Sequence, residues 1–501
     1  MKNQLRTAVL VALLAAAASA FAAPPQIRLS PQSGAAFLGA PASLNSTCIG
    51  DAPLSFQWYQ DGREVPGQTN RTLTLKAVQA ADEGDYTLVV TNGEGAATSE
   101  PARLHIVPPV TQVVHGEITN TAGRRLPYLY YPPDNYDPFQ QYSLYIGLAG
   151  SGSLEPAWLE DFVRTSPEAN VFRSYRQQLA HPVLQVYPAR RPGASTWEAP
   201  DLPLLLGMID RLIQEFNIDT NRVHLIGFSD GGRTAWELVG QRPGCFASVM
   251  VTATTGIPAN PVAVKHVPVW AFCAADDGGL IDTTRYLVSR LLQAGGNPIY
   301  TEYRSGGHDV LLTAMCAPSF VDWFLGQQRG VPSTTEPLLS ITRPTPEAAD
   351  TTCAMTVDLS GSVAACGRNI SQVNWTNLTA RIGGKASGTN LWSASAVRLA
   401  PDKTNLLVVT ATTTSWAPSL GGYTTFSDTL SVVCSPIRLG MSRMGQEASL
   451  TWSNGVPPFR VQRASELGRG DWVDLMTNAT PPVVLPLGGQ SGFYRVLGED
   501  H

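Results

Sequence analysis

A serine in a glycine-flanked turn is the first feature of the sequence that could do covalent chemistry. Residues 227–231 read GFSDG, which fits the pattern G-x-S-x-G with Ser229 at its centre. An apolar run precedes this turn at 223–228, and a helical pattern follows it at 232–239. A strand, a tight turn and a helix in that order expose a serine hydroxyl, while the glycines leave room for a strained backbone. We therefore predict that Ser229 is a nucleophile; the alternative is an ordinary junction that contains a serine by chance.

A histidine should follow this serine in the chain, because a serine hydroxyl attacks efficiently only when a base removes its proton. In triads built on such a turn, the order along the chain is serine, acid, histidine. His308 lies in the turn SGGHD after a predicted strand at 299–303, and His501 is the last residue. His224 lies inside the strand that precedes the serine, and His266 lies at the end of its strand opposite to the loops. We predict that His308 is the general base.

Two adjacent carboxylates follow a predicted strand at 267–272, where the acid of the triad is expected. They belong to Asp276 and Asp277 in the stretch AADDGG. A carboxylate in this place would hold the histidine ring in the required tautomer and stabilise its protonated form. We predict that Asp277 is the acid, with Asp276 and Asp282 as alternatives.

The elements that must position these side chains lie between residues 109 and 330. Strand-like apolar runs alternate there with amphipathic helical runs, which is typical of a parallel sheet wrapped by helices. Strands are predicted at 143–147, 183–187, 223–228, 248–252, 267–272 and 299–303, and helices at 202–216 and 282–294. The first of these helices has apolar residues at a period of about 3.6 residues. The expected fold class is α/β with a doubly wound, mostly parallel sheet.

Residues 24–108 have a different pattern, in which short strands alternate with turns. Cys48 precedes Trp58 by ten residues, as on the second and third strands of an immunoglobulin-like domain, which this stretch resembles. Tyr86 fits the tyrosine corner of that fold, and Leu88 stands where the second cysteine of the inter-sheet disulfide would be. We expect an immunoglobulin-like sandwich without this disulfide, in which Cys48 is a buried thiol.

Two further β-rich units are predicted after the α/β domain. Residues 338–436 resemble the bacterial immunoglobulin-like sandwiches that follow secreted enzymes, and 437–501 form a small unit expected to pack on its neighbour. The predicted strands lie at 355–359, 373–376, 391–397, 405–412, 424–433, 448–452, 459–462 and 493–496. Trp375, Trp392 and Trp416 are candidates for stacking on a polymer, although tryptophans in sandwiches more often belong to the core.

The first 22 residues have the pattern of a secretory signal peptide. Lys2 and Arg6 precede an apolar run at 8–19, and alanines at positions 20 and 22 form a cleavage site, with positions 18 and 20 as a second option. About 12 apolar residues are too few to cross a hydrocarbon core about 30 Å thick. We expect a secreted or periplasmic protein, with an uncleaved anchor as the alternative.

The composition excludes several classes of partner. The formal net charge is -5 and the sequence contains no block of Lys and Arg, which argues against nucleic acid. No later stretch has the roughly 18 apolar residues of a membrane span. Cysteines and histidines do not have the spacing of a zinc site, so we expect no metal and no cofactor. The chain is expected to act as a monomer.

The sequence has seven cysteines, and export would permit disulfides. Cys273 and Cys316 flank the acid and histidine loops, so a bridge between them would brace the predicted base. Cys353, Cys366 and Cys434 lie in the third unit, where any two of them could pair. Free thiols throughout are the alternative to both ideas.

Taken together, the motifs resemble a known enzyme family. Residues 129–328 are similar to secreted esterases related to polyhydroxybutyrate depolymerases and to feruloyl and acetylxylan esterases, which are allied to the prolyl-oligopeptidase group. The segments that carry the resemblance read LYYPP from 129, NIDTNRV from 217, GFSDG from 227 and YTEYRSGGHD from 300. The resemblance implies an α/β-hydrolase domain with Ser229, Asp277 and His308 as nucleophile, acid and base, which agrees with their spacing. It also implies an ester substrate, including polysaccharide-linked esters and polyesters.

Two departures from this family affect the oxyanion hole. Relatives usually carry His-Gly-x-Gly in the loop after the third strand, whereas residues 148–152 read LAGSG here, with Ala149 in place of the histidine. Backbone amides stabilise an oxyanion whatever side chain they carry. We expect the amides of Ser151 and Asp230 to form the hole, with Gly150 as the alternative to Ser151.

Asp230 is itself the second departure, because relatives often carry an uncharged residue beside the nucleophile. An inward-facing carboxylate would oppose a developing oxyanion, so we expect Asp230 to face solvent or to pair with Arg233. Trp197 follows a strand end and is predicted to bind substrate by lining the acyl or alcohol pocket, with plain packing as the alternative. The same two roles are open to Trp158 and Phe162.

Three functions are therefore considered. The first is an exported serine ester hydrolase that works through an acyl-enzyme on a polymer-linked ester or a polyester. The second is a serine peptidase of the prolyl-oligopeptidase type, which shares the fold and the triad. The third is a surface-binding protein with a degenerate hydrolase domain, which the β-rich units favour and the complete triad disfavours.

Overall fold

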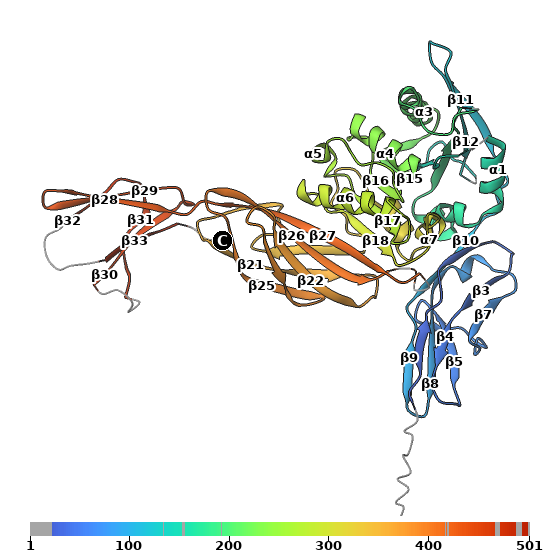
Figure 1. The fold of residues 1–501 in the computed structure, drawn as a ribbon, viewed down its shortest axis with the longest axis horizontal. Coiled ribbons are helices and arrows are strands. Elements are labelled where there is room, and N and C mark those ends of the chain that lie inside the picture. Colours follow the sequence, from blue (N-terminus) through green and yellow to red (C-terminus); the bar gives the residue numbers. More distant parts are fainter. Residues whose placement is uncertain are drawn as a thin grey trace, which may run out of the picture.

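The computed structural model describes residues 23–133, 135–152, 156–191, 193–415, 417, 420–465, 471–486 and 493–498. The predicted signal peptide at 1–22 lies outside the described residues, as do Trp416 and His501. The described chain forms an amino-terminal sandwich, a helix-covered sheet and two further β-rich units (Figure 1).

The amino-terminal unit is a sandwich of short strands. Its elements are β1 (Gln26–Leu29), β2 (Gly34–Phe37), β3 (Ala42–Asn45), β4 (Thr47–Ile49), β5 (Ser55–Gln60), β6 (Arg63–Glu64), β7 (Thr72–Leu75), η1 (Ala80–Asp82), β8 (Gly84–Asn92), β9 (Gly95–Thr98) and β10 (Ala102–Val107). Trp58 is fully buried and is paired with Leu88 on β8. The hydroxyl of Tyr86 donates a hydrogen bond to the carbonyl oxygen of Asp82 at 2.8 Å, so the predicted tyrosine corner is confirmed. Cys48 is a buried free thiol, as expected.

The second unit is built on a mostly parallel sheet. Its strands are β11 (Val114–Thr119), β12 (Arg125–Tyr131), β13 (Tyr142–Leu148), β14 (Val183–Pro188), β15 (Ile218–Phe228), β16 (Ser248–Thr252), β17 (Val269–Ala274) and β18 (Ile299–Tyr303). They lie in the order β11-β12-β14-β13-β15-β16-β17-β18, with parallel pairing from β14 to β18. All six strands predicted from the sequence are present, although β15 begins at Ile218 rather than at 223.

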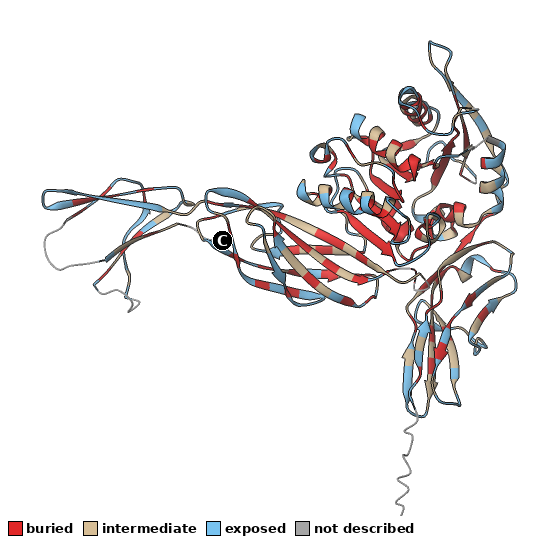
Figure 2. Ribbon diagram, in the orientation of Figure 1, coloured by how far each residue is buried: buried red, intermediate tan, exposed pale blue. Residues whose placement is uncertain are grey.

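Helices cover both faces of this sheet. They are α1 (Pro156–Thr165), η2 (Glu168–Arg173), α2 (Tyr175–Ala180), η3 (Ala199–Asp201), α3 (Leu202–Glu215), α4 (Asp230–Gln241), α5 (Pro261–Val264), α6 (Leu280–Gln293), α7 (Leu311–Met315) and α8 (Phe320–Gly326). Successive strand residues point to opposite faces. Leu225 belongs to a core with α3, α4 and α6, and its neighbour Ile226 belongs to a core with α1 and α8. Figure 2 shows the central strands of the sheet as buried, whereas the edge strand β11 is partly exposed.

The third unit extends the same sheet. Its strands are β19 (Leu338–Arg343), β20 (Ala349–Thr352), β21 (Thr356–Ala364), β22 (Ile370–Asn377), β23 (Ile382–Lys385), β24 (Ser387–Gly388), β25 (Leu391–Arg398), β26 (Lys403–Thr414) and β27 (Tyr423–Cys434). One of its two sheets has the order β19-β21-β25-β24, and the other runs β27-β26-β22-β23. Strand β27 pairs antiparallel with β18 of the second unit, so the expected sandwich is joined to the parallel sheet rather than separate from it. The two units also share one hydrophobic core.

The fourth unit is small and has its own core. Its strands are β28 (Arg438–Met444), β29 (Glu447–Ser453), β30 (Phe459–Ala464), β31 (Val473–Ala479), β32 (Val483–Pro486) and β33 (Phe493–Leu497), which form two three-stranded sheets. Leu450, Trp452 and Val461 are buried between them.

The structure also decides the predictions about cysteine pairs and about the tryptophans of the third unit. The bridge between Cys273 and Cys316 is absent, because both are buried free thiols that lie on opposite sides of the sheet. Cys366 and Cys434 are also free, so no pair forms among the cysteines of the third unit. Trp392 is buried in the core rather than available for stacking, and Trp375 packs against that core. Within the described residues, none of the helices combines the length and the apolar character that a membrane span needs.

Candidate active site

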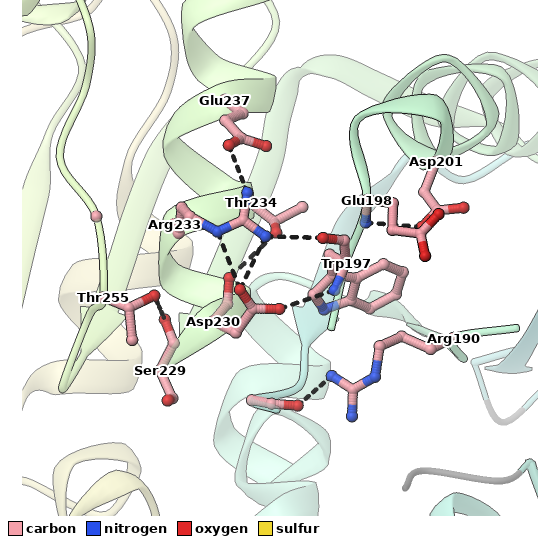
Figure 3. A network of polar contacts seen from close by, with 12 residues as sticks. Arg190, Trp197, Glu198, Asp201, Ser229, Asp230, Arg233, Thr234, Glu237 and Thr255 are labelled. Carbon is pink, nitrogen blue, oxygen red and sulfur yellow. Dashed lines mark hydrogen bonds and ion pairs between the residues drawn. The ribbon is translucent and has the colours of Figure 1, made fainter. Parts of the chain in front are cut away.

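Ser229 lies between β15, which ends at Phe228, and α4, which begins at Asp230. Its backbone has φ 53° and ψ −116°, a conformation that non-glycine residues adopt only under strain. Its amide donates a hydrogen bond to the carbonyl oxygen of Thr252 at 2.9 Å, and Thr255 Oγ1 contacts the Ser229 carbonyl at 3.4 Å (Figure 3). These bonds hold the strained turn at the carboxyl end of the sheet.

Close packing explains the two glycines of this turn. A Cβ atom on Gly227 would lie 2.5 Å from the carbonyl oxygen of Gly231. A Cβ atom on Gly231 would lie 2.2 Å from the carbonyl oxygen of Leu148. Because no side chain fits at these distances, α4 packs directly on residues 148–152, which we call the oxyanion loop.

The predicted acid and base are in contact. Nδ1 of His308 lies 3.0 Å from Oδ1 and 3.1 Å from Oδ2 of Asp277. The two residues follow β17 and β18, so neighbouring parallel strands bring them together at one edge of the sheet. The Asp277 side chain is 8% exposed, whereas that of His308 is 44% exposed. The imidazole is thus oriented by a buried carboxylate and remains accessible to a substrate.

A buried thiol also contacts the acid. Sγ of Cys273 lies 3.7 Å from Oδ2 of Asp277. Burial raises the pKa of the Cys273 thiol to about 12, so the thiol keeps its proton and can donate a weak hydrogen bond. This contact gives the free cysteine a role in orienting the carboxylate.

The other two candidate acids do other things. Asp276 accepts hydrogen bonds from the amides of Gly307 at 2.8 Å and Gly306 at 3.3 Å, and the Gly307 bond holds the pKa of this carboxyl below its usual range. The Asp282 side chain is 83% exposed and lies 3.7 Å from Arg285. Of the three candidates, Asp277 is the one that the structure brings to His308.

His308 lies beside an apolar cavity, close to the end of β15, the strand that leads into Ser229. The ring of Phe228 lies 4.9 Å from the imidazole of His308, measured between ring centroids, and both line the cavity. The cavity has a volume of about 590 Å³. Ligand sites in proteins commonly have about 300–1,000 Å³ and mostly apolar walls. An apolar part of a ligand would therefore fit next to Phe228 and His308.

The walls of the cavity come from several segments. They are the oxyanion loop, the strands β13, β14 and β15, the helices η2, α1 and α7, and residues 308–309. Trp158 and Phe162 line it from α1, with their rings stacked 5.3 Å apart. Leu311 and Leu312 line it from α7. Trp158 and Phe162 thus line a cavity, as the first of the two roles that the sequence left open would require.

The oxyanion loop is packed against Ser229 and held by a buried arginine. A Cβ atom on Gly150 would lie 3.0 Å from Cβ of Ser229. The guanidinium of Arg190 donates hydrogen bonds to the carbonyl oxygens of Gly150 and Gly152. Arg190 is only 2% exposed, and the loss of hydration lowers its pKa, although arginine stays charged in proteins. A fixed positive charge therefore lies directly behind the loop.

Trp197 supports the same loop from the side of Arg190. Its indole Nε1 donates a hydrogen bond to the carbonyl oxygen of Ala149 at 2.9 Å, and the Arg190 guanidinium lies 5.7 Å from the indole ring. Trp197 is 3% exposed and is not among the residues that line the cavity. The predicted substrate contact is therefore not made, because the indole fills the space behind the loop instead.

Asp230 is neutralised by its neighbours. Its Oδ1 accepts hydrogen bonds from Nε and Nη2 of Arg233 at 2.9 and 2.8 Å, and its Oδ2 accepts one from the amide of Trp197 at 2.8 Å. Arg233 also pairs with Glu237 at 2.5 Å. Figure 3 shows the Asp230 carboxylate turned toward Arg233 and Trp197. The expected pairing with Arg233 is present, and the backbone amide of Asp230 stands at the start of α4, where helix amides have no partner within the helix.

Arg190 is the residue of this site that sequence reasoning missed. Its position directly after β14, beside the strand that leads into the oxyanion loop, was the available signal. The arrangement as a whole brings together a serine in a strained turn, a histidine paired with a carboxylate, and an apolar cavity. The described part of the chain has no cluster of three or more His, Cys, Asp or Glu side chains that could hold a metal ion.

Comparison with known proteins gives a family match for the amino-terminal part of the chain. Residues 24–92 match the family model for an immunoglobulin domain. The bifunctional acetylxylan esterase/xylanase XynS20E of Neocallimastix patriciarum is 30% identical over 95 residues, which are 18% of this chain and 14% of that protein. The match thus spans a small part of the curated relative.

Two solved structures are similar to larger parts of the chain. A thermostable esterase is 19% identical with a TM-score of 0.41, and the match covers 60% of this chain and 100% of that one. A ferulic acid esterase is 16% identical with a TM-score of 0.33, and the match covers 40% of this chain and 91% of that one. The chain thus carries an immunoglobulin-like domain and is similar to esterases.

Proposed function

We propose that this chain is an exported serine carboxylic-ester hydrolase with a doubly wound α/β-hydrolase domain. The observation that carries the proposal is the hydrogen-bonded pair of Asp277 and His308 beside the strained backbone of Ser229. A serine at such a turn, with a histidine oriented by a carboxylate, is the arrangement that acyl-transfer enzymes share on unrelated folds.

In the proposed reaction, Oγ of Ser229 attacks the ester carbonyl carbon while Nε2 of His308 takes the hydroxyl proton. Asp277 holds Nδ1–H and stabilises the imidazolium. The bond between the carbonyl carbon and the alcohol oxygen then breaks, and His308 gives its proton to the leaving alcohol. Water attacks the acyl-enzyme by the same route, which releases the acid and restores Ser229.

The negative charge that develops on the carbonyl oxygen needs hydrogen-bond donors. We assign these to the backbone amides of Ser151 and Asp230, with Gly150 as the alternative to Ser151. Gly150 packs on Ser229, and Arg190 and Trp197 fix the carbonyl groups of the same loop. A donor fixed in advance is worth about 2.7–4 kcal/mol of transition-state stabilisation.

The cavity supports an ester with an apolar acyl or alcohol part. Its stacked pair of Trp158 and Phe162 and its leucine wall give apolar contacts but few polar ones. Esters attached to polysaccharides and polyesters remain the proposed natural substrates, outside the cell and without a cofactor, for a monomeric enzyme. The curated relative, named as an acetylxylan esterase/xylanase, supports an ester of the first kind.

A direct test compares purified wild-type protein with Ser229→Ala on p-nitrophenyl butyrate. The expected result is loss of turnover in Ser229→Ala with an unchanged unfolding temperature. Ser453→Ala, an exposed serine on β29, is the matched control and should keep full activity. Activity that persists in Ser229→Ala would exclude the assignment.

The same preparation separates the rival functions. A serine peptidase would cleave peptide p-nitroanilides with a kcat/KM comparable to that for the ester. A surface-binding protein with a degenerate domain would turn over neither substrate, and its Ser229 would not react with an alkyl phosphonate. A comparison of the hydrolysis rates of acetylated or feruloylated polysaccharide and of polyester then identifies the class of ester substrate.

Export has its own measurement. Expression with the full leader in a Gram-negative host should give a protein whose amino-terminus is residue 23, or residue 21 if the second cleavage site is used. Mass spectrometry of the periplasmic and medium fractions reads this terminus. Recovery of the uncleaved chain in the membrane fraction would instead favour the anchor.

A further inference from the structure

The turn between β26 and β27 of the third unit reaches the segment that carries the base. Its described residues are Ser415, Ala417 and 420–422. The segment before His308, residues 304–307, is here called the histidine loop. The carbonyl oxygen of Leu420 accepts hydrogen bonds from the amides of Arg304 at 3.2 Å and Ser305 at 3.3 Å. A residue of another unit therefore satisfies the first two amides of the histidine loop.

The side chain of Leu420 also packs on the histidine loop. A Cβ atom on Gly306 would lie 3.3 Å from Cδ1 of Leu420, so the leucine covers the glycine directly. Leu420 also packs on the core that the second and third units share. The loop cannot move away from β18 without breaking this cover.

Gly422 makes the closest approach. Its φ is +97°, and a Cβ atom there would lie 1.9 Å from the carbonyl oxygen of Glu302 and 2.9 Å from the amide nitrogen of Arg304. Only glycine allows two backbones to come this close. The turn thus lies against the last residues of β18, directly before the histidine loop.

The described residues of the turn are joined by hydrogen bonds to one another. Oγ of Ser415 donates to the carbonyl oxygen of Gly421 at 2.5 Å, and the amides of Leu420 and Gly421 donate to the carbonyl oxygen of Ala417 at 3.0 and 3.1 Å. The two strands that it joins are paired along their whole length. These bonds fix the position of Leu420 and Gly422 relative to β26 and β27.

Side chains lock the two units together next to the turn. The hydroxyl of Tyr423, the first residue of β27, donates to Oε2 of Glu302 at 2.8 Å. Arg285 and Tyr300 of the second unit donate to the same carboxylate. Two neutral hydroxyls and one charged guanidinium thus meet on one buried carboxylate at the junction.

The opposite side of the histidine loop is held by Asp276, through the amides of Gly306 and Gly307. We propose that the β26–β27 turn of the third unit positions the base, because it fixes the histidine loop so that His308 meets Asp277 and Ser229. Leu420 and Gly422 are then positioning residues. This inference rests on the proposed esterase function.

The test compares Gly422→Ala with Gly388→Ala in the full chain. Gly388 lies in the other sheet of the third unit, has φ +83°, and would place a Cβ atom 2.1 Å from the carbonyl oxygen of Leu391, so it strains the same unit equally. A misplacement of about 1 Å in a catalytic group can cost 10²-fold in rate. For p-nitrophenyl butyrate, we expect kcat to fall about 10–100-fold in Gly422→Ala with KM within about twofold, and kcat to be unchanged in Gly388→Ala.

Leu420→Ala and Tyr423→Phe keep the test decisive if Gly422→Ala does not fold. Each should lower kcat and, in the same proportion, the rate at which an alkyl phosphonate labels Ser229, a readout that lost stability alone does not move in folded protein. Wild-type kcat in both variants would overturn the proposal. Turnover that survives in Ser229→Ala would instead refute the proposed function, so the two failures are distinguishable.

Discussion

The loops on the two sides of Ser229 are held by different kinds of contact. The oxyanion loop is fixed from within its own unit by the buried guanidinium of Arg190 and the indole of Trp197. The histidine loop is held by neutral backbone hydrogen bonds to Leu420 of another unit and by the exposed carboxylate of Asp276. One side is set by local charge and burial, whereas the other depends on how two units pack.

This difference teaches where the site tolerates change. A buried charge that loses its partners is costly, so the oxyanion side should fail sharply when one member of its network is removed. Backbone bonds between units are weaker singly but numerous, so the histidine side should respond in smaller steps. The following substitutions test this contrast, in order of expected effect.

The largest loss is expected for Asp277→Asn. Asparagine cannot stabilise the imidazolium and favours the wrong histidine tautomer, so kcat/KM should fall by about 10⁴-fold. Asp276→Asn is the matched control, because an amide oxygen still accepts from Gly306 and Gly307, and kcat/KM should stay within about fivefold. Equal losses in the two variants would show that the acid has been assigned to the wrong aspartate.

Arg190→Met should come next. It removes the donors that fix the carbonyls of Gly150 and Gly152, and a misaligned oxyanion donor lowers kcat by about 10²–10³-fold. Trp197→Phe removes one indole donor from Ala149 and should cost about tenfold at most. Steady-state kinetics on p-nitrophenyl butyrate, with circular dichroism to verify folding, measures both. An unchanged kcat in Arg190→Met would show that the buried charge does not hold the oxyanion loop in place for catalysis.

Asp230→Asn should affect stability more than rate. The amide keeps an acceptor for Trp197 but loses the charge that pairs with Arg233, and hydrogen bonds to charged groups are worth about 1.5–3 kcal/mol. Urea unfolding should show a loss of about 1–3 kcal/mol in the free energy of unfolding, with kcat within about threefold. A large loss of kcat at constant stability would mean that the Asp230 carboxylate takes part in the reaction.

The smallest effect concerns the junction carboxylate and pH. Burial alone would raise the pKa of Glu302, but hydrogen bonds from Arg285, Tyr300 and Tyr423 outweigh it and hold the pKa below the usual value of 4.5. A carboxyl with a lowered pKa stabilises the fold above pH 4.5, and this contribution is lost as the pH falls through the lowered value. Glu302→Gln should therefore be less stable than wild type at pH 7, and the gap should narrow below pH 4.5. A gap that stays constant with pH would mean that the charge of Glu302 does not matter.

Local patterns in the sequence predicted much of this molecule. The strands before Ser229, Asp277 and His308 were predicted because each is a short apolar run, and the helix α3 because its period of about 3.6 residues is visible within a single segment. The elbow at Ser229 was predicted because its glycines have a steric reason that is local as well. The candidate base His308 was predicted from chain order, once the serine was chosen, whereas chain order left three aspartates open as the acid.

Contacts between distant segments could not be predicted in the same way. The pairing of β18 with β27 joins Tyr300 to Thr425, and the residues on these strands look like those of any half-buried strand. Trp197 was expected at the cavity because its distance from the strand end does not reveal the direction of its side chain. The prediction of a bridge between Cys273 and Cys316 was wrong for the same reason. Nearness to two neighbouring loops does not tell which face of the sheet a side chain occupies.

The junction of β18 and β27 has a consequence for solubility. Without the third unit, β18 would be the last strand of a parallel sheet, with a row of open backbone donors and acceptors and buried-type side chains. Such an edge is a template for another strand and therefore for aggregation. A chain shortened to the second unit would expose this edge. The third unit therefore protects the edge permanently, and a shortened chain would need charged residues, a proline or a helix there in its place.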